Sequence, residues 1–298
     1  MSCHVRGAPR RALPLLLLLP SMLLLATLVI YPTLFTVRNA FYYWNLQTSP
    51  RPLMFVGWEN FRYVLSSTPF FPALRNTLVI ATAGTVVELL LGLGVALLLL
   101  THLPGTRLLR TLLIMPVAVA PIVVGFLFRY MYYEQGGLIP WFLTLLRLPV
   151  PPEGLLGSAR TALPSVLLAD VWQWTPFFAL VLYTGLLGIS QELVDAARVD
   201  GARGGQLVWH IYLPMVWPSA AIVCMIRFMQ LFNLFDLVLV LTRGGPGTAT
   251  YTLAYLLYQE GLVNYNIGTA SAMTLIIVAL VLLLLNIYAR YAFRRWEW

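Results

Sequence analysis

The sequence contains no lysine, so all 19 basic residues among its 298 are arginines. A phosphate-binding loop that ends in GK[ST] needs a lysine, and Schiff-base catalysis needs a lysine amine. The chain therefore has no P-loop with which to hydrolyse ATP, and chemistry through a lysine nucleophile is excluded.

Groups that bind metals or form disulfides are also scarce. The two cysteines, Cys3 and Cys224, lie far apart in the sequence, and the three isolated histidines form no HExxH motif. Neither a disulfide framework nor a zinc site has this spacing. We expect no metal site, no bound cofactor and no catalytic residue in this chain.

Charged residues make up only 10% of the sequence, whereas 60% are hydrophobic and the mean hydropathy is +0.81. A typical soluble domain carries roughly 25% charged residues. No water-soluble core of this size could bury so many apolar side chains. The composition therefore predicts an integral membrane protein, and the net charge of +8 requires no nucleic-acid partner.

Six apolar segments are long enough to cross a bilayer, for which a helix needs roughly 20 mainly apolar residues. Their hydrophobicity is continuous rather than alternating, which favours helices over an outer-membrane barrel. We predict an all-α membrane protein with one transmembrane domain over residues 1–298. The predicted spans are about 12–37, 77–100, 108–131, 163–189, 211–241 and 269–289.

The arginines predict the orientation of these spans. With the N-terminus inside, the cytoplasmic segments hold ten arginines in about 50 residues, and the opposite side holds seven in about 100. Because positive residues accumulate in cytoplasmic loops, we predict that both termini are cytoplasmic.

The predicted cytoplasmic loop at 190–214, between the fourth and fifth spans, has helix signals of its own. Ser190 can cap a short helix, and Glu192 lies in its first turn, where a negative charge is favourable. Gly201 permits a turn without a Cβ penalty. On these features alone, an amphipathic segment that lies on the membrane is an equally good interpretation.

The same loop also contains a spaced set of residues, in chain order Asp195, Ala196, Ala197, Gly201, Ile211, Leu213 and Pro214. This set resembles the EAA motif of the permease subunits of binding-protein-dependent ABC importers. In that family the loop is the coupling helix, which docks in a cleft of the cytoplasmic ATPase subunit. The usual glutamate of the motif is Asp195 here, which keeps the charge but shortens the reach by one methylene. The ATPase-coupling residues that the resemblance implies are Glu192, Asp195, Ala196, Ala197, Asp200, Gly201, Leu213 and Pro214.

A second segment, at 241–247, reads LTRGGPG. It resembles the LT-x-GGP segment of the first permease subunit in sugar importers of the maltose and glycerol-phosphate type; by itself it predicts only a turn at a membrane exit. The resemblance implies the type I ABC importer permease fold, in a bacterial or archaeal cytoplasmic membrane. It also implies three kinds of protein partner: a second homologous permease, two copies of an ATPase that uses ATP and Mg, and an extracytoplasmic solute-binding protein.

Five ionisable residues lie at membrane depth in the predicted spans, where each costs at least about 2.5–3.5 kcal/mol and marks a functional site by default. Arg129 and Asp236 lie near span ends and can snorkel or cap. For Glu88, in the middle of the second span, we favour an interhelical ion pair over a contact with a ligand. Asp170 and Arg227 are the better candidates for function.

Polar and aromatic residues share one face of the fourth span and one face of the fifth. Sugars are bound by planar polar groups that match paired hydroxyls, together with an aromatic ring against the apolar sugar face. Resemblance to the maltose-type permease points to the same two faces. The predicted substrate path comprises Asp170, Gln173, Trp174, Phe177, Arg227, Gln230, Leu231 and Leu234. The alternative is a structural ion pair between Asp170 and Arg227, which is compatible with a nearby binding site.

We therefore predict a non-catalytic permease subunit of an ATP-driven importer of a sugar, most simply a di- or oligosaccharide. An importer of another solute, such as glycerol phosphate, a polyamine or an osmolyte, is the main alternative. A polyamine path should carry several carboxylates, and a phosphate ester favours more than one arginine on the same face. An intramembrane enzyme is a remote alternative, because the spans contain no polar catalytic constellation.

Overall fold

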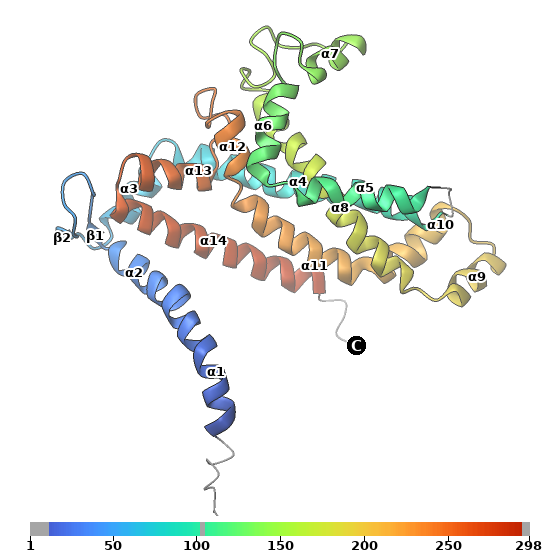
Figure 1. Ribbon diagram of the computed structural model, residues 1–298, viewed down its shortest axis with the longest axis horizontal. Coiled ribbons are helices and arrows are strands. Elements are labelled where there is room, and N and C mark those ends of the chain that lie inside the picture. The colour runs from blue at the N-terminus through green and yellow to red at the C-terminus, as the bar shows by residue number, and fades with distance from the viewer. Residues whose placement is uncertain (1–11, 102–104, 294–298) are drawn as a thin grey trace, which may run out of the picture. The chain divides into compact units, whose positions relative to one another are not determined.

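The computed structural model describes residues 12–101 and 105–293 (Figure 1). Within these residues, five helices are long and apolar enough to cross a membrane, or six if one sharply bent pair counts as a single span. The predicted all-α membrane fold is confirmed. Residues 1–11 and 294–298, which carry several of the arginines behind the predicted orientation, lie outside the described residues, so the orientation stays a prediction.

The chain divides into two compact units, and the first comprises the residues up to Ser66 together with Gln259–Val278. Its apolar span is Leu17–Asn39, and no residue in the most hydrophobic 18-residue stretch of this span is buried within the protein. This exposure is expected of a helix that faces lipid. The Asn45 amide donates to the Asn264 carbonyl at 3.1 Å and to Asn266 Oδ1 at 2.5 Å, which joins the two segments of the unit. Its elements are α1 (Ala12–Leu25), η1 (Ala26–Ile30), α2 (Tyr31–Asn39), β1 (Tyr42–Tyr43), antiparallel β2 (Met54–Phe55), α3 (Glu59–Ser66), η3 (Gln259–Val263) and the first part of α14 (Ile267–Phe293).

The second unit, Ser67–Tyr258 with the residues from Ala279 onward, contains the remaining helices. Helices α4 and α8 pack along each other, and α11 packs against both. Gly92 on α4 permits this approach, because a Cβ there would overlap the Cβ of Phe178 on α8. The elements are α4 (Phe70–Leu100), α5 (Thr106–Ala118), α6 (Pro121–Met131), α7 (Leu138–Leu145), α8 (Ala162–Leu187), α9 (Gln191–Val199), α10 (Gly205–Leu207), η2 (Val208–Tyr212), α11 (Leu213–Phe232), α12 (Asp236–Leu241), α13 (Leu253–Tyr258) and the end of α14.

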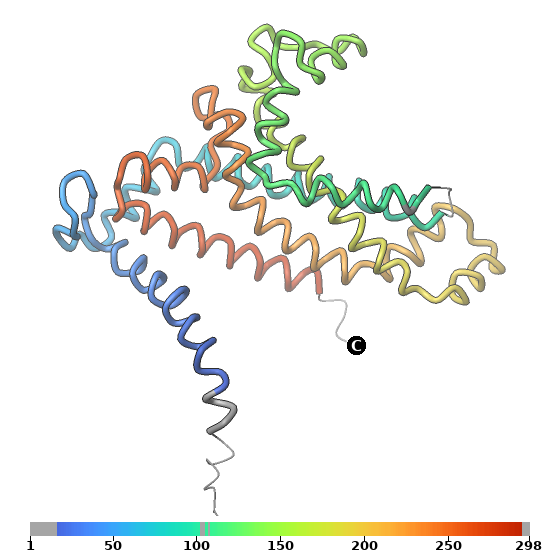
Figure 2. Tube along the Cα trace, in the orientation of Figure 1, coloured from blue at the N-terminus to red at the C-terminus, as the bar shows by residue number. Residues whose placement is uncertain are grey.

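The predicted third span, 108–131, is not one straight helix. Helices α5 and α6 meet at 99°, as a broken span or a re-entrant loop, and the turn is visible in the green part of the trace (Figure 2). Pro121 is the first residue of α6, and a proline disfavours the helical conformation of the residue before it. Val119 and Ala120 are accordingly extended, which breaks the helix at this point.

The predicted fifth span, 211–241, is also corrected. Helix α11 ends at Phe232, and α12 begins separately at Asp236. The Asn233 amide donates back to the Met229 carbonyl at 3.1 Å, a local bond that competes with continuation of the helix. Pro176 has no such effect, since α8 runs through it without a break.

Candidate functional site

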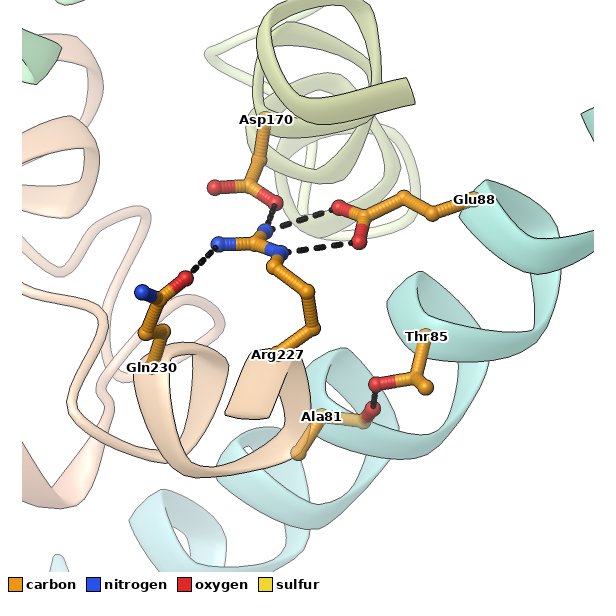
Figure 3. Close-up of polar contacts among 6 residues, drawn as sticks. All are labelled: Ala81, Thr85, Glu88, Asp170, Arg227 and Gln230. Carbon is orange, nitrogen blue, oxygen red and sulfur yellow. Dashed lines mark hydrogen bonds and ion pairs between the residues drawn. The ribbon is translucent and has the colours of Figure 1, made fainter. Parts of the chain in front are cut away.

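A buried arginine joins three helices of the second unit. Arg227 on α11 is only 2% exposed, and its Nε and Nη2 atoms donate to the two carboxylate oxygens of Glu88 on α4, at 2.9 and 2.8 Å (Figure 3). Nη2 also donates to Asp170 Oδ2 on α8 at 2.6 Å. Nη1 donates to Gln230 Oε1, one turn along α11, at 2.9 Å. The planar guanidinium thus makes a bidentate fork to one carboxylate and single bonds to two other groups.

An indole covers one face of this guanidinium. The Arg227 Cζ atom lies 4.6 Å from the ring centroid of Trp174, within the range of a cation–π interaction. Trp174 also meets Phe177 edge to face, with centroids 6.0 Å apart. We call Arg227, Glu88, Asp170, Gln230 and Trp174 together the arginine cluster.

One guanidinium faces two carboxyl groups in the cluster. Glu88 is fully buried and Asp170 is 2% exposed, so neither carboxylate is solvated by water at the surface. Buried charges of this kind persist when they are paired and hydrogen-bonded. The structure therefore contains both the expected interhelical pair of Glu88 and the ion pair of Asp170 with Arg227.

The eight predicted path residues separate into two groups. Leu231 and Leu234 are buried in the helix packing, at 0% and 9% exposure, and Gln173 is 1% exposed. Trp174 and Phe177 are partly exposed, and Gln230 is exposed. Of the eight, only Trp174, Phe177 and Gln230 therefore reach the surface of the second unit.

Gln173 has a structural partner that the sequence did not suggest. Its Nε2 donates to the carbonyl of Val119 at 2.7 Å, which is one of the carbonyls freed at the bend between α5 and α6. Its Oε1 is buried and has no partner among the described residues. Gln173 thus anchors the bend to α8.

The loop at 190–214 begins with the helix that the sequence predicts. Ser190 Oγ accepts from the backbone N–H of Leu193 at 3.4 Å and caps α9, and Val194 is the buried residue that attaches this helix to the second unit. Asp195 is exposed and accepts from Gln191 and Arg198, each at 3.0 Å. Its charge therefore lies on the surface of α9, partly satisfied within the helix.

Beyond α9 the loop forms a shallow cleft of about 270 Å³. Gly201 has a φ of +90°, which an L side chain rarely adopts, and no atom lies within 4 Å of a Cβ built there. Of the other implied coupling residues, Glu192, Ala196 and Pro214 are exposed, and Leu213 is half-buried at the start of α11. The cleft is lined by Ala197, Asp200, Gly201, Ala202, Gln206, His210 and Ile211.

Hydrogen bonds hold the residues on both sides of the segment at 241–247. Asn76 on α4 donates to the carbonyls of Thr248, Ala249 and Tyr251, at 3.0 to 3.2 Å, and so holds the turn against the start of the helix. Arg129 donates to the Val240 carbonyl at 2.9 Å at the end of α12. These contacts hold the end of α12 against α6 and the turn that follows it against α4.

The chain is similar to known transport proteins. A family model described as "Binding-protein-dependent transport system inner membrane component" matches residues 88–298. A trehalose/maltose transport system permease from Thermococcus litoralis is 35% identical over 81% of this chain and 81% of its own length. An sn-glycerol-3-phosphate transport system permease from Rhizobium meliloti is 32% identical over 96% of this chain and 97% of its own.

One solved structure has the same fold. It is the crystal structure of a bacterial ABC transporter involved in the import of the acidic polysaccharide alginate, with a TM-score of 0.80, 20% identity, and 97% of each chain covered. This likeness concerns the fold, and it confirms the predicted type I importer permease fold.

Proposed function

The chain belongs to the family of binding-protein-dependent transport system inner membrane components, and from this premise we propose that it is a permease subunit of an ATP-driven importer of a neutral di- or oligosaccharide. It is a multi-pass protein of the inner membrane. The observation that carries the proposal is the similarity, over most of the chain, to a permease of a trehalose/maltose transport system.

The charge of the arginine cluster supports a neutral solute. Arg227 is enclosed by Glu88 and Asp170, so the cluster offers an anion no unpaired cation. An anionic solute such as sn-glycerol 3-phosphate, which a relative at 32% identity transports by name, would meet two carboxyl groups and no free cation there. A polyamine would compete with Arg227 for carboxylates that are already paired. A sugar needs only hydrogen bonds and an aromatic face, which Gln230, Trp174 and Phe177 provide.

We propose that the loop at 190–214 couples this permease to two copies of a cytoplasmic ATPase, which bind ATP and Mg. The exposed face of α9 and the open surface around Gly201 support this role, because another protein can approach both closely. The permease itself supplies no catalytic group and no cofactor site. A second homologous permease would form the other half of the path, and an extracytoplasmic binding protein would deliver the sugar. In this arrangement both termini of the chain are cytoplasmic.

Two measurements test this function. Sugars are first screened for thermal stabilisation of the cognate binding protein, and the loaded protein is then added to the assembled complex. We expect loaded binding protein to stimulate ATP hydrolysis, and we expect Gly201→Asp to abolish that stimulation and the association of the ATPase. If Gly201→Asp leaves both intact, the coupling assignment is wrong. If glycerol 3-phosphate stabilises the binding protein and no sugar does, the solute class is wrong.

A further inference from the structure

The hydrogen-bonding capacity of Arg227 is almost fully used inside the protein. Its donors make four bonds, to Glu88, Asp170 and Gln230, and a guanidinium has only five N–H groups. The Trp174 indole covers one of its faces. With 2% of its surface exposed, Arg227 cannot reach a solute without breaking these contacts.

The contact with Arg227 fixes the direction of the Gln230 amide. Arginine only donates hydrogen bonds, so the oxygen of the amide must face the guanidinium. The amide nitrogen then points away from the cluster (Figure 3). Because the Gln230 side chain is exposed, its two N–H donors are presented at the surface of the second unit.

An exposed amide at this depth is unsuited to contact with lipid. Arg227 pairs with Glu88, which lies 12 residues from the end of α4, or roughly 18 Å along the helix at 1.5 Å per residue. Polar groups this far inside a membrane face the helix bundle or a water-filled cavity. Asn233, three residues on and immediately after the end of α11, is exposed as well. These two residues give this end of the α11 surface a polar character that is typical of a solute path.

We propose that Arg227 is a positioning residue, and that the groups that contact the transported sugar are the outward N–H donors of Gln230 and the partly exposed indole of Trp174. Glu88 and Asp170 hold Arg227 in place and do not contact the sugar. Gln230 therefore recognises an oxygen that accepts a hydrogen bond, while the indole packs against the apolar face of the ring. This inference rests on the proposed function, since it assumes that a sugar passes along this surface.

A double-mutant cycle tests the division of roles. The complex is reconstituted in proteoliposomes with saturating binding protein, and uptake of labelled trehalose is measured for Gln230→Met, for Arg227→Lys and for the double variant. Methionine keeps the length of the side chain but has no donor, so Gln230→Met should lower uptake about two- to tenfold, the effect of one neutral hydrogen bond. Gln47→Met, at an exposed glutamine in the first unit, is the matched control and should leave uptake unchanged.

Arg227→Lys keeps a positive charge beside the carboxylates but loses the planar set of N–H donors, including the Nη1 donor that holds Gln230. We expect it to lower uptake by a similar factor, and adding Gln230→Met should then cause no further loss. If the two losses multiply instead, Arg227 and Gln230 act independently on the solute and the inference is overturned.

Gln230→Asn provides a test that does not depend on folding of the Arg227 variant. Asparagine carries the same amide on a side chain one methylene shorter, which cannot bind Arg227 and reach the solute together. We expect uptake to fall as in Gln230→Met, and unchanged uptake by either variant would overturn the inference. Failure of the proposed function looks different, because the unsubstituted complex would then take up neither trehalose nor any other neutral sugar.

Discussion

Replacing Arg227 by methionine would leave two buried carboxylates without their cation. The side chains of Arg227 and Glu88 are 2% and 0% exposed. The Nη2 atom of Arg227 lies 2.8 Å from Glu88 Oε1 and 2.6 Å from Asp170 Oδ2. Removing one partner of a buried ion pair typically costs about 3–5 kcal/mol, because the remaining charge stays buried and unpaired. A loss of this size is a large part of the stability of an ordinary domain, which is about 5–15 kcal/mol.

The assay is thermal unfolding of the detergent-solubilised complex, together with its yield after assembly. Arg227→Met should lower both strongly. Arg198→Met is the matched control, since Arg198 also pairs with a carboxylate, at 3.0 Å, but its side chain is 54% exposed. A surface pair of this kind contributes about 0–1 kcal/mol, so the control should change the melting temperature little.

A charge-free triple variant separates pairing from packing. When Glu88→Gln and Asp170→Asn are added to Arg227→Met, no unpaired charge remains, and most of the lost stability should return. If Arg227→Met melts like the unsubstituted complex, or if the triple variant is no more stable than the single one, electrostatic pairing does not hold these helices together and the reasoning fails.

Four other substitutions give independent tests. Gly92→Ala should destabilise the complex by about 1–3 kcal/mol, because the new Cβ would overlap Phe178. Gly94→Ala, where the new Cβ meets open space, should stabilise the helix by up to about 1 kcal/mol. Melting temperatures of the two variants that shift in the same direction would contradict this. Gln173→Leu should cost about 1–3 kcal/mol in thermal unfolding, because it leaves the carbonyl at the bend unpaired, and an unchanged melting temperature would contradict that role. Gly201→Asp should abolish copurification of the ATPase while the two permeases still assemble, and retained ATPase would contradict the coupling role.

Local features of the fold could be predicted from the sequence. The N-cap at Ser190 depends only on its own hydroxyl oxygen and on the backbone N–H of Leu193, three residues later, and the structure contains the hydrogen bond between them. The number of apolar spans also follows from composition, provided that α5 and α6 count as one. Their bend could not be predicted from hydropathy, because the apolar run continues on both sides of Pro121. The end of α11 at Phe232 was missed for the same reason, since residues 237–241 are apolar as well.

The candidate site could be predicted only in part. Helical periodicity identified the faces of α8 and α11 and placed Arg227, Gln230 and Trp174 on them. It could not identify Glu88 as the main partner of Arg227, because the two are 139 residues apart and meet only through the packing of α4 on α11. Gln173 was assigned to the path on the same periodicity. Its actual partner, the Val119 carbonyl, exists only because of the bend, which the sequence did not reveal.

The most direct test of sugar import is uptake by the assembled complex in proteoliposomes that contain ATP. With loaded binding protein outside, we predict ATP-dependent accumulation of labelled trehalose or another neutral oligosaccharide, and no accumulation when ADP replaces ATP. Accumulation of glycerol 3-phosphate without uptake of any neutral sugar would contradict the proposed function.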